Sequence, residues 1–185
     1  MEVYLIRHTT PQVEKGIIYG HMDVPLAKSF TQEKEEILKQ FPFTFDAVYS
    51  SPSLRCTQLA AAILPNYIVQ KELMELNFGD WEGLTWDAVA GAQCDAWMND
   101  FVNIAPPNGE CMLEMQKRII KFWEHLLLQP YQRTAIVTHA GVIRVLLAHY
   151  RSIALKDSFA IKVDLGAVVK LMVSKSSPEA HRLYK

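Results

Sequence analysis

Two short apolar runs in this chain each end directly at a histidine. Residues 3–6, Val-Tyr-Leu-Ile, run into Arg7 and His8, and residues 134–138, Thr-Ala-Ile-Val-Thr, run into His139. An apolar helical pattern follows the second run, which is the strand–helix order of a parallel sheet. In open α/β sheets, side chains just past the carboxyl ends of the strands face the crevice that binds ligands. We therefore expect both histidines at one edge of a single sheet.

The rest of the chain alternates between strand and helix patterns. We predict further strands at 45–49 and 67–69, helices at 33–41, 54–64, 111–128 and 142–150, and two β-rich runs at 158–163 and 168–173, before a polar tail from residue 174. Helices between successive strands imply parallel crossovers that cover both faces of the sheet. The predicted fold is a three-layer α/β/α arrangement with a mainly parallel sheet and one antiparallel edge strand.

Length and composition indicate a single domain spanning residues 1–185. Half of the residues are apolar and 21% are charged, which is ordinary for a globular protein of this size. One stretch departs from the regular alternation: glycines and prolines interrupt short helical pieces around Trp86 and Ala96. We interpret this stretch, about 72–110, as a cap over the site.

The charge balance restricts the partners of the chain. A formal net charge of −1 argues against a nucleic-acid or anionic-membrane surface, which would need a basic stripe. The three cysteines, Cys56, Cys94 and Cys111, are odd in number and lack metal-binding spacing, so neither a disulfide framework nor a zinc site is expected. No secretory leader or membrane-spanning run of roughly 20 apolar residues is visible, and we expect the protein in the cytoplasm. Any anion it binds needs a local cationic cluster.

Such a cluster is predicted at the carboxyl edge of the sheet. Arg55 lies in the first turn of the helix that follows the second strand, so it joins Arg7, His8 and His139 there. Guanidinium forks suit a phosphoryl group, and the helix N-terminus adds backbone donors. A neutral imidazole can attack phosphorus and form a phosphohistidine that water later hydrolyses.

This chemistry also needs an acid for the leaving oxygen. Glu75 has apolar neighbours, which would help to keep its carboxyl protonated for donation. Asp80, Glu82 and Glu110 are interpreted as solvated surface charges instead. Glu75 is therefore the candidate general acid.

These segments resemble motifs of the histidine phosphatase (phosphoglycerate mutase-like) superfamily, in the family's order. The matching stretches are Leu-Ile-Arg-His-Thr at 5–9, Tyr-Gly-His-Met-Asp-Val-Pro-Leu at 19–26, Ser-Ser-Pro-Ser-Leu-Arg-Cys-Thr-Gln at 50–58, Glu-Leu-Asn-Phe-Gly-Asp-Trp-Glu-Gly at 75–83, Pro-Pro-Asn-Gly-Glu at 106–110 and Thr-His-Ala-Gly at 138–141. The resemblance implies a phosphoglycerate mutase-like fold and a phosphomonoester hydrolase that acts on a small-molecule phosphate monoester. It implies no metal and no cofactor, and it carries no signal of oligomeric state.

The resemblance also implies a role for individual residues. It makes His8 the nucleophile, Arg7, Arg55 and His139 the phosphate pocket, Glu75 the acid, and Tyr19, Gly20 and His21 part of the substrate-binding loop. Three positions depart from the family pattern: Thr9 and Ala140 replace glycines, and Cys111 replaces a serine. Thr9 matters most, because a β-branched residue cannot adopt at low cost the backbone angles open to glycine.

The composition of the cap bears on the substrate. No Lys or Arg occurs from Glu72 to Gln116, whereas a mutase needs cations for a substrate carboxylate. The cap offers Trp81, Trp86, Trp97 and Phe101, which would suit a neutral or aromatic leaving group unless they simply pack the cap.

Within the superfamily, two segments resemble the α-ribazole phosphatases most. These segments are residues 19–26 and 78–83. The α-ribazole phosphatases remove the 5′-phosphate of a benzimidazole nucleotide during assembly of the lower loop of cobalamin, and this is the substrate we predict. The alternatives are a broad-specificity phosphomonoesterase, a phosphoglycerate mutase, and a degenerate phosphate-binding module without turnover.

Overall fold

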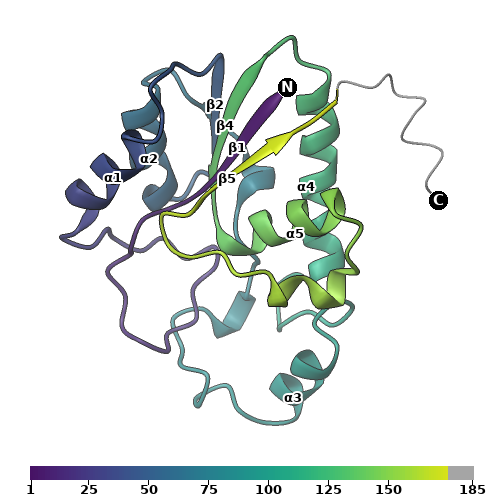
Figure 1. The fold of residues 1–185 in the computed structure, drawn as a ribbon. Helices are drawn as coiled ribbons and strands as arrows, with labels where there is room; N and C mark the ends of the chain where they lie inside the picture. Colours follow the sequence, from purple (N-terminus) through teal and green to yellow (C-terminus); the bar gives the residue numbers. More distant parts are fainter. Residues whose placement is uncertain (175–185) are drawn as a thin grey trace.

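A single five-stranded sheet forms the centre of the molecule in a computed structural model that describes residues 1–174 (Figure 1). The strands are β1 (Glu2–Arg7), β2 (Ala47–Ser50), β3 (Ile68–Val69), β4 (Arg133–Thr138) and β5 (Val168–Met172). Their order is β3-β2-β4-β1-β5; the first four are parallel and β5 runs antiparallel at the edge beside β1. The predicted sheet is confirmed, whereas the predicted polar tail lies outside the described residues from 175 onward.

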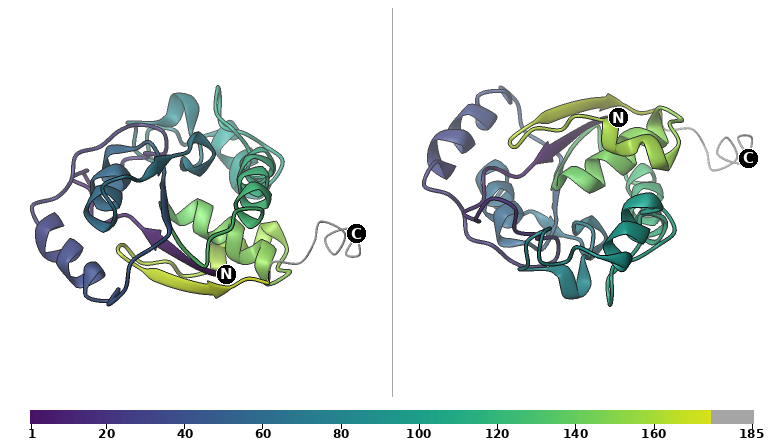
Figure 2. Two further views of the ribbon diagram at one scale, coloured as in Figure 1. Left: turned by 90° about the horizontal axis from the view of Figure 1, so that it is seen from above. Right: turned by 90° about the horizontal axis from the view of Figure 1, so that it is seen from below.

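Helices cover both faces of this sheet, which confirms the three-layer arrangement (Figures 1 and 2). On one face lie α1 (Phe30–Leu38) and α2 (Leu54–Ile63), and on the other lie α4 (Met112–Leu127) and α5 (Ala140–Tyr150). The first helix begins three residues before the predicted 33–41, with Ser29 at its N-cap position. In the described residues no helix has both the length and the apolarity that crossing a membrane requires.

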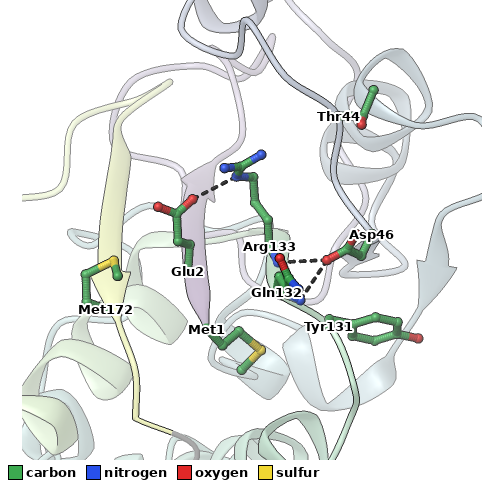
Figure 3. Close-up of a pocket in the computed structure, with 8 residues that line it drawn as sticks. All are labelled: Met1, Glu2, Thr44, Asp46, Tyr131, Gln132, Arg133 and Met172. Atoms are coloured by element: carbon green, nitrogen blue, oxygen red, sulfur yellow. Dashed lines mark hydrogen bonds and ion pairs between the residues drawn. The ribbon is translucent and has the colours of Figure 1, made fainter.

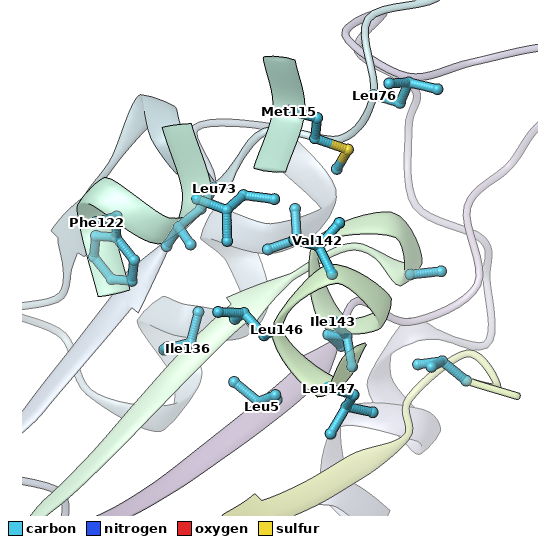
Figure 4. Packing of buried hydrophobic residues seen from close by; sticks show 14 of the residues in the cluster. Leu5, Leu73, Leu76, Met115, Phe122, Ile136, Val142, Ile143, Leu146 and Leu147 are labelled. Atoms are coloured by element: carbon cyan, nitrogen blue, oxygen red, sulfur yellow. The ribbon is translucent and has the colours of Figure 1, made fainter. Parts of the chain in front are cut away.

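The alternation of side chains along β1 divides the core between the two faces. Val3 and Leu5 face α4 and α5, while Tyr4 and Ile6 face α1 and α2. On the α4/α5 side, Figure 4 shows Leu5 and Ile136 of the sheet below Leu146 of α5. Each fully buried side chain of this kind contributes roughly 1.5–3 kcal/mol, so both layers are fixed to the sheet.

Two local predictions were wrong. The β-rich run at 158–163 is not a strand: residues Leu155–Ala160 form a 3-10 helix that packs on α5. The edge of β1 is taken by β5, and residues 155–160 pack on α5 instead of pairing with a strand; a short apolar run fits either structure. Around Trp86 the chain forms turns rather than a helical piece.

The segment between β3 and α4 lies beyond the carboxyl ends of the parallel strands, at the bottom of Figure 1. It contains two 3-10 turns, Lys71–Leu73 and Gly79–Trp81, and the short helix α3 (Ala92–Asn99). This places the stretch expected to form a cap at the same end of the sheet as both histidines.

Candidate active site

A cavity of about 180 Å³ lies at the carboxyl ends of β1 and β4. Its wall brings together all five residues predicted to act in catalysis, and Tyr19 beside them: Arg7, His8, Tyr19, Arg55, Glu75 and His139. These residues come from five segments that are far apart in the chain. Both histidines therefore lie at one edge of the sheet, as the strand–histidine pattern predicted, because the parallel strands β1 and β4 end there.

His8 follows β1 and is held in one tautomer by its neighbour. Its Nδ1–H donates to the carbonyl oxygen of Thr9 at 2.7 Å, and the side chain is almost fully buried. Burial is the main cause that lowers the pKa of His8 from 6.5 to about 3, and the positive charges of Arg55 and Arg7 lower it further. The ring is thus neutral, with an unprotonated Nε2 that can act as a nucleophile.

Thr9 causes none of the backbone strain that the sequence suggested. Among the described residues other than glycine, only Asn108 and Ser152 have positive φ, so Thr9 adopts ordinary backbone angles. Its side chain is buried and its carbonyl orients the imidazole of His8. The missing glycine therefore leaves the geometry at His8 intact.

His139 caps the N-terminus of α5 and lies beside His8, with 5.2 Å between the ring centroids. Its Nε2 is hydrogen-bonded to the hydroxyl of Ser51 at 2.8 Å, and the thiol of Cys56 lies 3.6 Å from the same nitrogen. Burial first, and then the charge of Arg55, hold the pKa of His139 well below its usual range. A neutral His139 can donate a hydrogen bond to a phosphoryl oxygen without adding charge.

Arg55 is fully buried in the first turn of α2, and the 19–23 loop orients its guanidinium. Nη2 donates to the carbonyl of Gly20 at 2.7 Å and Nη1 to the carbonyl of Met22 at 3.1 Å. A Cβ at Gly20 would overlap the carbonyl oxygen of Leu76, so this approach requires glycine. Gly20 therefore acts on the site through its carbonyl and lies outside the cavity wall.

The 19–23 loop is itself fixed by Glu82, which the sequence suggested to be a surface charge. The Glu82 carboxylate accepts backbone N–H groups from His21 at 2.8 Å, from Phe78 at 3.1 Å and from Met22. His21 is not among the residues that line the cavity, and its Nε2 lies 3.8 Å from the Glu110 carboxylate. His21 is thus brought near the site without lining it.

The Glu75 carboxylate contacts the first turn of α5, directly after His139 at its N-cap. One carboxylate oxygen accepts the N–H of Gly141 at 3.1 Å and the other accepts the N–H of Leu76 at 3.0 Å. A Cβ at Gly141 would overlap the Glu75 carboxylate, whereas Ala140 one residue earlier fits. In the Thr-His-Ala-Gly stretch, only the second small residue must be glycine.

A partly buried arginine that the sequence gave no reason to select holds the backbone around Glu75. Arg118 of α4 donates to the carbonyls of Glu72, Met74 and Glu75 at 2.6, 2.8 and 2.9 Å. It also makes a bidentate pair with Glu110 at 3.0 and 2.6 Å, so Glu110 is structural rather than a free surface charge. The sequence could not predict this role, because Arg118 reaches these carbonyls only when the 72–75 turn packs against α4.

The cap aromatics pack against one another. Trp81, Trp86 and Trp97 have ring centroids 5.7–6.5 Å apart, Phe101 lies 6.2 Å from Trp97, and none of the four lines the cavity. The packing alternative therefore holds for them. The aromatic residues in the cavity wall are instead Tyr19, Phe78 and Phe159, joined by Arg144 of α5.

A second cavity, of about 600 Å³, lies at the opposite end of the sheet (Figure 3). Its charges are already paired: Glu2 accepts from Arg133 at 2.7 Å, and Asp46 accepts the backbone N–H groups of Gln132 and Arg133. These pairs leave little charge for a ligand. Within residues 1–174 no cluster of three or more His, Cys, Asp or Glu side chains could hold a metal ion.

Comparison with known proteins gives one family. A model of the histidine phosphatase superfamily (branch 1) matches residues 3–185. The chain is 30% identical over 177 residues to the adenosylcobalamin/alpha-ribazole phosphatase of Escherichia coli, covering 90% of this chain and 87% of that protein. It is 29% identical over 181 residues to a protein of Hydrogenobacter thermophilus provisionally named phosphoserine phosphatase 2, covering 91% and 88%.

Solved structures give the same fold. The crystal structure of the alpha-ribazole phosphatase from Shigella flexneri matches with a TM-score of 0.85 at 28% identity, over 94% of this chain and 91% of that one. The two relatives compared by sequence are thus named for different substrates, α-ribazole phosphate and phosphoserine.

Proposed function

The chain belongs to branch 1 of the histidine phosphatase superfamily and is a phosphatase, and on that premise we propose that it transfers the phosphoryl group of a small-molecule monoester to His8 and then to water. The observation that carries this proposal is the hydrogen bond from Nδ1–H of His8 to Thr9, which leaves Nε2 unprotonated in a cationic cavity. Such a nitrogen is a ready nucleophile.

In the first step, Arg7, Arg55 and His139 hold the phosphoryl oxygens while Nε2 of His8 attacks phosphorus. The bond between phosphorus and the ester oxygen breaks, and protonated Glu75 donates its proton to that leaving oxygen, which departs as an alcohol. The charge that builds on the phosphoryl oxygens is stabilised by groups that the fold already orients.

In the second step, water attacks the phosphohistidine. The Glu75 carboxylate takes the proton of the water, the phosphorus–nitrogen bond breaks, and inorganic phosphate and neutral His8 are released. Glu75 ends this step protonated, ready for the next turnover. The two steps balance to hydrolysis of one ester bond by one water molecule.

Two substrate classes are candidates. The first is α-ribazole 5′-phosphate, supported by the resemblance of residues 19–26 and 78–83 and by the relatives that carry that name. Tyr19, Phe78 and Phe159 at the cavity would offer apolar surface to a nucleoside. The second is a small phosphorylated acid, which Arg144 in the cavity wall favours. A cytoplasmic location remains part of the proposal, supported by three buried, unpaired cysteines.

Rapid quench during turnover of p-nitrophenyl phosphate tests the mechanism. We expect an acid-labile phosphoenzyme that mass spectrometry locates on His8, and we expect His8→Ala to abolish both the phosphoenzyme and turnover while the far-UV circular dichroism stays native. Phosphate on another residue, or none during a productive turnover, would contradict the nucleophile assignment. A chain that binds phosphate without turnover would be the degenerate phosphate-binding module.

A further inference from the structure

We propose that Arg144 forms a second anion subsite beside the phosphate pocket, and that it takes a carboxylate carried by the leaving group. The inference rests on the proposed phosphatase function and deepens it. Of the two candidate classes, it selects small phosphorylated hydroxy acids and hydroxy amino acids over a neutral nucleoside.

The guanidinium of Arg144 is anchored from one side only. It projects from the first half of α5, its Nε donates to the carbonyl of Ile161 at 3.0 Å, and it lies 5.5 Å from the ring centroid of Phe159. In the described part of the chain no carboxylate pairs with it, and its two terminal nitrogens make no hydrogen bond. Its planar donor fork is therefore free, and its residue lines the cavity that contains His8.

The charge balance of the cavity favours an anion at the free guanidinium of Arg144. Three guanidiniums, those of Arg7, Arg55 and Arg144, line a wall in which Glu75 is the single carboxylate. A phosphoryl dianion accounts for Arg7 and Arg55, which flank His8. Arg144 is near enough to Arg7 to help lower the pKa of that side chain, although burial is the larger cause. A further anion beside the phosphoryl group would relieve this repulsion.

The size of the cavity restricts what can carry that anion. Its volume of about 180 Å³ is below the roughly 300–1,000 Å³ typical of sites that enclose drug-sized ligands. A carboxylate has three heavy atoms and matches a guanidinium fork in a bidentate pair. A compact acid such as the serine moiety fits this description better than a benzimidazole nucleoside, most of which would remain outside.

The position of Arg144 explains why the sequence pointed to a neutral leaving group. That expectation rested on the absence of Lys and Arg between Glu72 and Gln116. The cation instead reaches the cavity from α5, outside the cap segment. A count of charges along the cap could not include it.

The test compares two esters that differ only in the carboxylate, O-phosphoserine and O-phosphoethanolamine. Because a hydrogen bond to a charged group is worth roughly 1.5–3 kcal/mol, we expect kcat/KM of the wild-type protein to favour phosphoserine by roughly 10- to 100-fold. Arg144→Gln should bring this ratio close to one. The ratio is taken within each variant, so a general loss of activity cancels. Arg151→Gln, on an exposed arginine at the end of the same helix, is the matched control and should keep the wild-type ratio.

The outcomes separate the two proposals. If the protein turns over p-nitrophenyl phosphate but gives equal rates with the matched esters, or if Arg144→Gln keeps the wild-type ratio, the subsite is overturned and the phosphatase function stands. Faster turnover of α-ribazole 5′-phosphate than of phosphoserine would also overturn the subsite. A phosphoenzyme that forms on no ester would instead overturn the proposed function itself.

Discussion

At the scale of single residues, the site depends on what burial does to two imidazoles. His8 and His139 are both nearly inaccessible to solvent, so the cost of burying a charge keeps them neutral. The Thr9 carbonyl then decides which nitrogen of His8 carries the hydrogen. Arginine side chains, which stay protonated, supply the positive charge instead. This division lets one cavity contain both a neutral imidazole, the proposed nucleophile, and the cationic side chains of the proposed phosphate pocket.

The role of Glu75 can be tested by changing the leaving group. Glu75→Gln keeps the shape and removes the proton, so the bond-breaking step should slow by roughly 10² to 10⁴ for an alkyl phosphate. For p-nitrophenyl phosphate the loss should be much smaller, because p-nitrophenolate is already a stable anion. Single-turnover measurements on both esters check this, since hydrolysis of the phosphohistidine could otherwise limit both rates. Equal losses for the two esters would indicate that Glu75 positions the substrate rather than donating a proton.

At the scale of elements, two helices of one layer assemble the site. The first half of α5 provides Gly141, whose N–H meets Glu75, and Arg144, and its N-cap is His139. From α4 comes Arg118, which gathers three carbonyls of the 72–75 turn. Glu75, the proposed general acid, is therefore held between α4 behind its backbone and α5 at its carboxylate. Packing of α4 on α5 couples these two constraints.

Removal of the hydrogen bonds that Arg118 donates to the 72–75 turn should reproduce part of the rate loss expected for Glu75→Gln. Arg118→Met frees the turn that presents Glu75, and a displacement of about 1 Å can cost on the order of 10²-fold in rate. We expect this loss with an alkyl ester and a clearly smaller loss with p-nitrophenyl phosphate, measured in single turnover. Lys117→Met, at the exposed neighbouring position of α4, is the matched control and should leave both rates unchanged.

A merely structural role of Arg118 would give a different pattern. Loss of Arg118 leaves the partly buried Glu110 without its cation, so some loss of stability is expected and the circular dichroism and unfolding midpoint need to be recorded. A loss of rate of equal size for both esters would then show that Arg118 supports the fold without orienting Glu75. Glu110→Gln keeps a hydrogen-bond acceptor for Arg118. This variant should therefore show a smaller loss of rate than Arg118→Met, with the same dependence on the leaving group.

At the scale of the whole molecule, the two ends of the sheet differ in how they treat charge. At the amino end, Glu2 is paired with both Arg133 and Lys170, and hydrogen bonds from Lys170 and Arg133 lower its pKa to about 2. At the carboxyl end, the three arginines that line the cavity outnumber its single carboxylate, Glu75, although Arg55 also lies 4.0 Å from Asp23, and two histidines are buried neutral. The folded chain therefore has an unfavourable arrangement of charge at the end where we propose that the substrate binds, and this should weaken its stability in acid.

This arrangement predicts a pH dependence of stability. Below about pH 6.5 the unfolded chain protonates its histidines, whereas native His8 stays neutral until the pH falls toward about 3, and the pKa of His139 is lowered in the same direction. The unfolded state then binds more protons, so the free energy of unfolding should fall as pH decreases from about 6.5, by about 1.4 kcal/mol per pH unit for each such group. Urea unfolding at a series of pH values measures the slope.

The double variant His8→Gln/His139→Gln should flatten that slope. His125→Gln, at an exposed position near the end of α4, is the control and should retain the wild-type slope. A slope unchanged by the double variant would mean that carboxylates alone, such as Glu2 and Glu33, govern acid unfolding.

The sequence by itself determined the sheet and which histidines and arginines meet at its carboxyl edge. Apolar runs that end at His8 and His139 imply strands whose carboxyl ends meet, and Arg7 and Arg55, which were predicted beside them, line the same cavity. These predictions succeeded because strand and helix periodicity is a short-range property that the chain carries residue by residue.

Only the tertiary structure decided the surroundings of that chemistry. Arg144 and Phe159 enter the cavity from α5 and from a 3-10 helix that the sequence suggested to be a strand. Arg118 and Glu82 bind backbone groups of segments far from them in the chain, and the cap tryptophans pack on each other instead of facing the cavity. Each of these depends on which surfaces meet after folding, and no periodicity along the chain encodes such a meeting, because it is set by the packing of whole elements against one another.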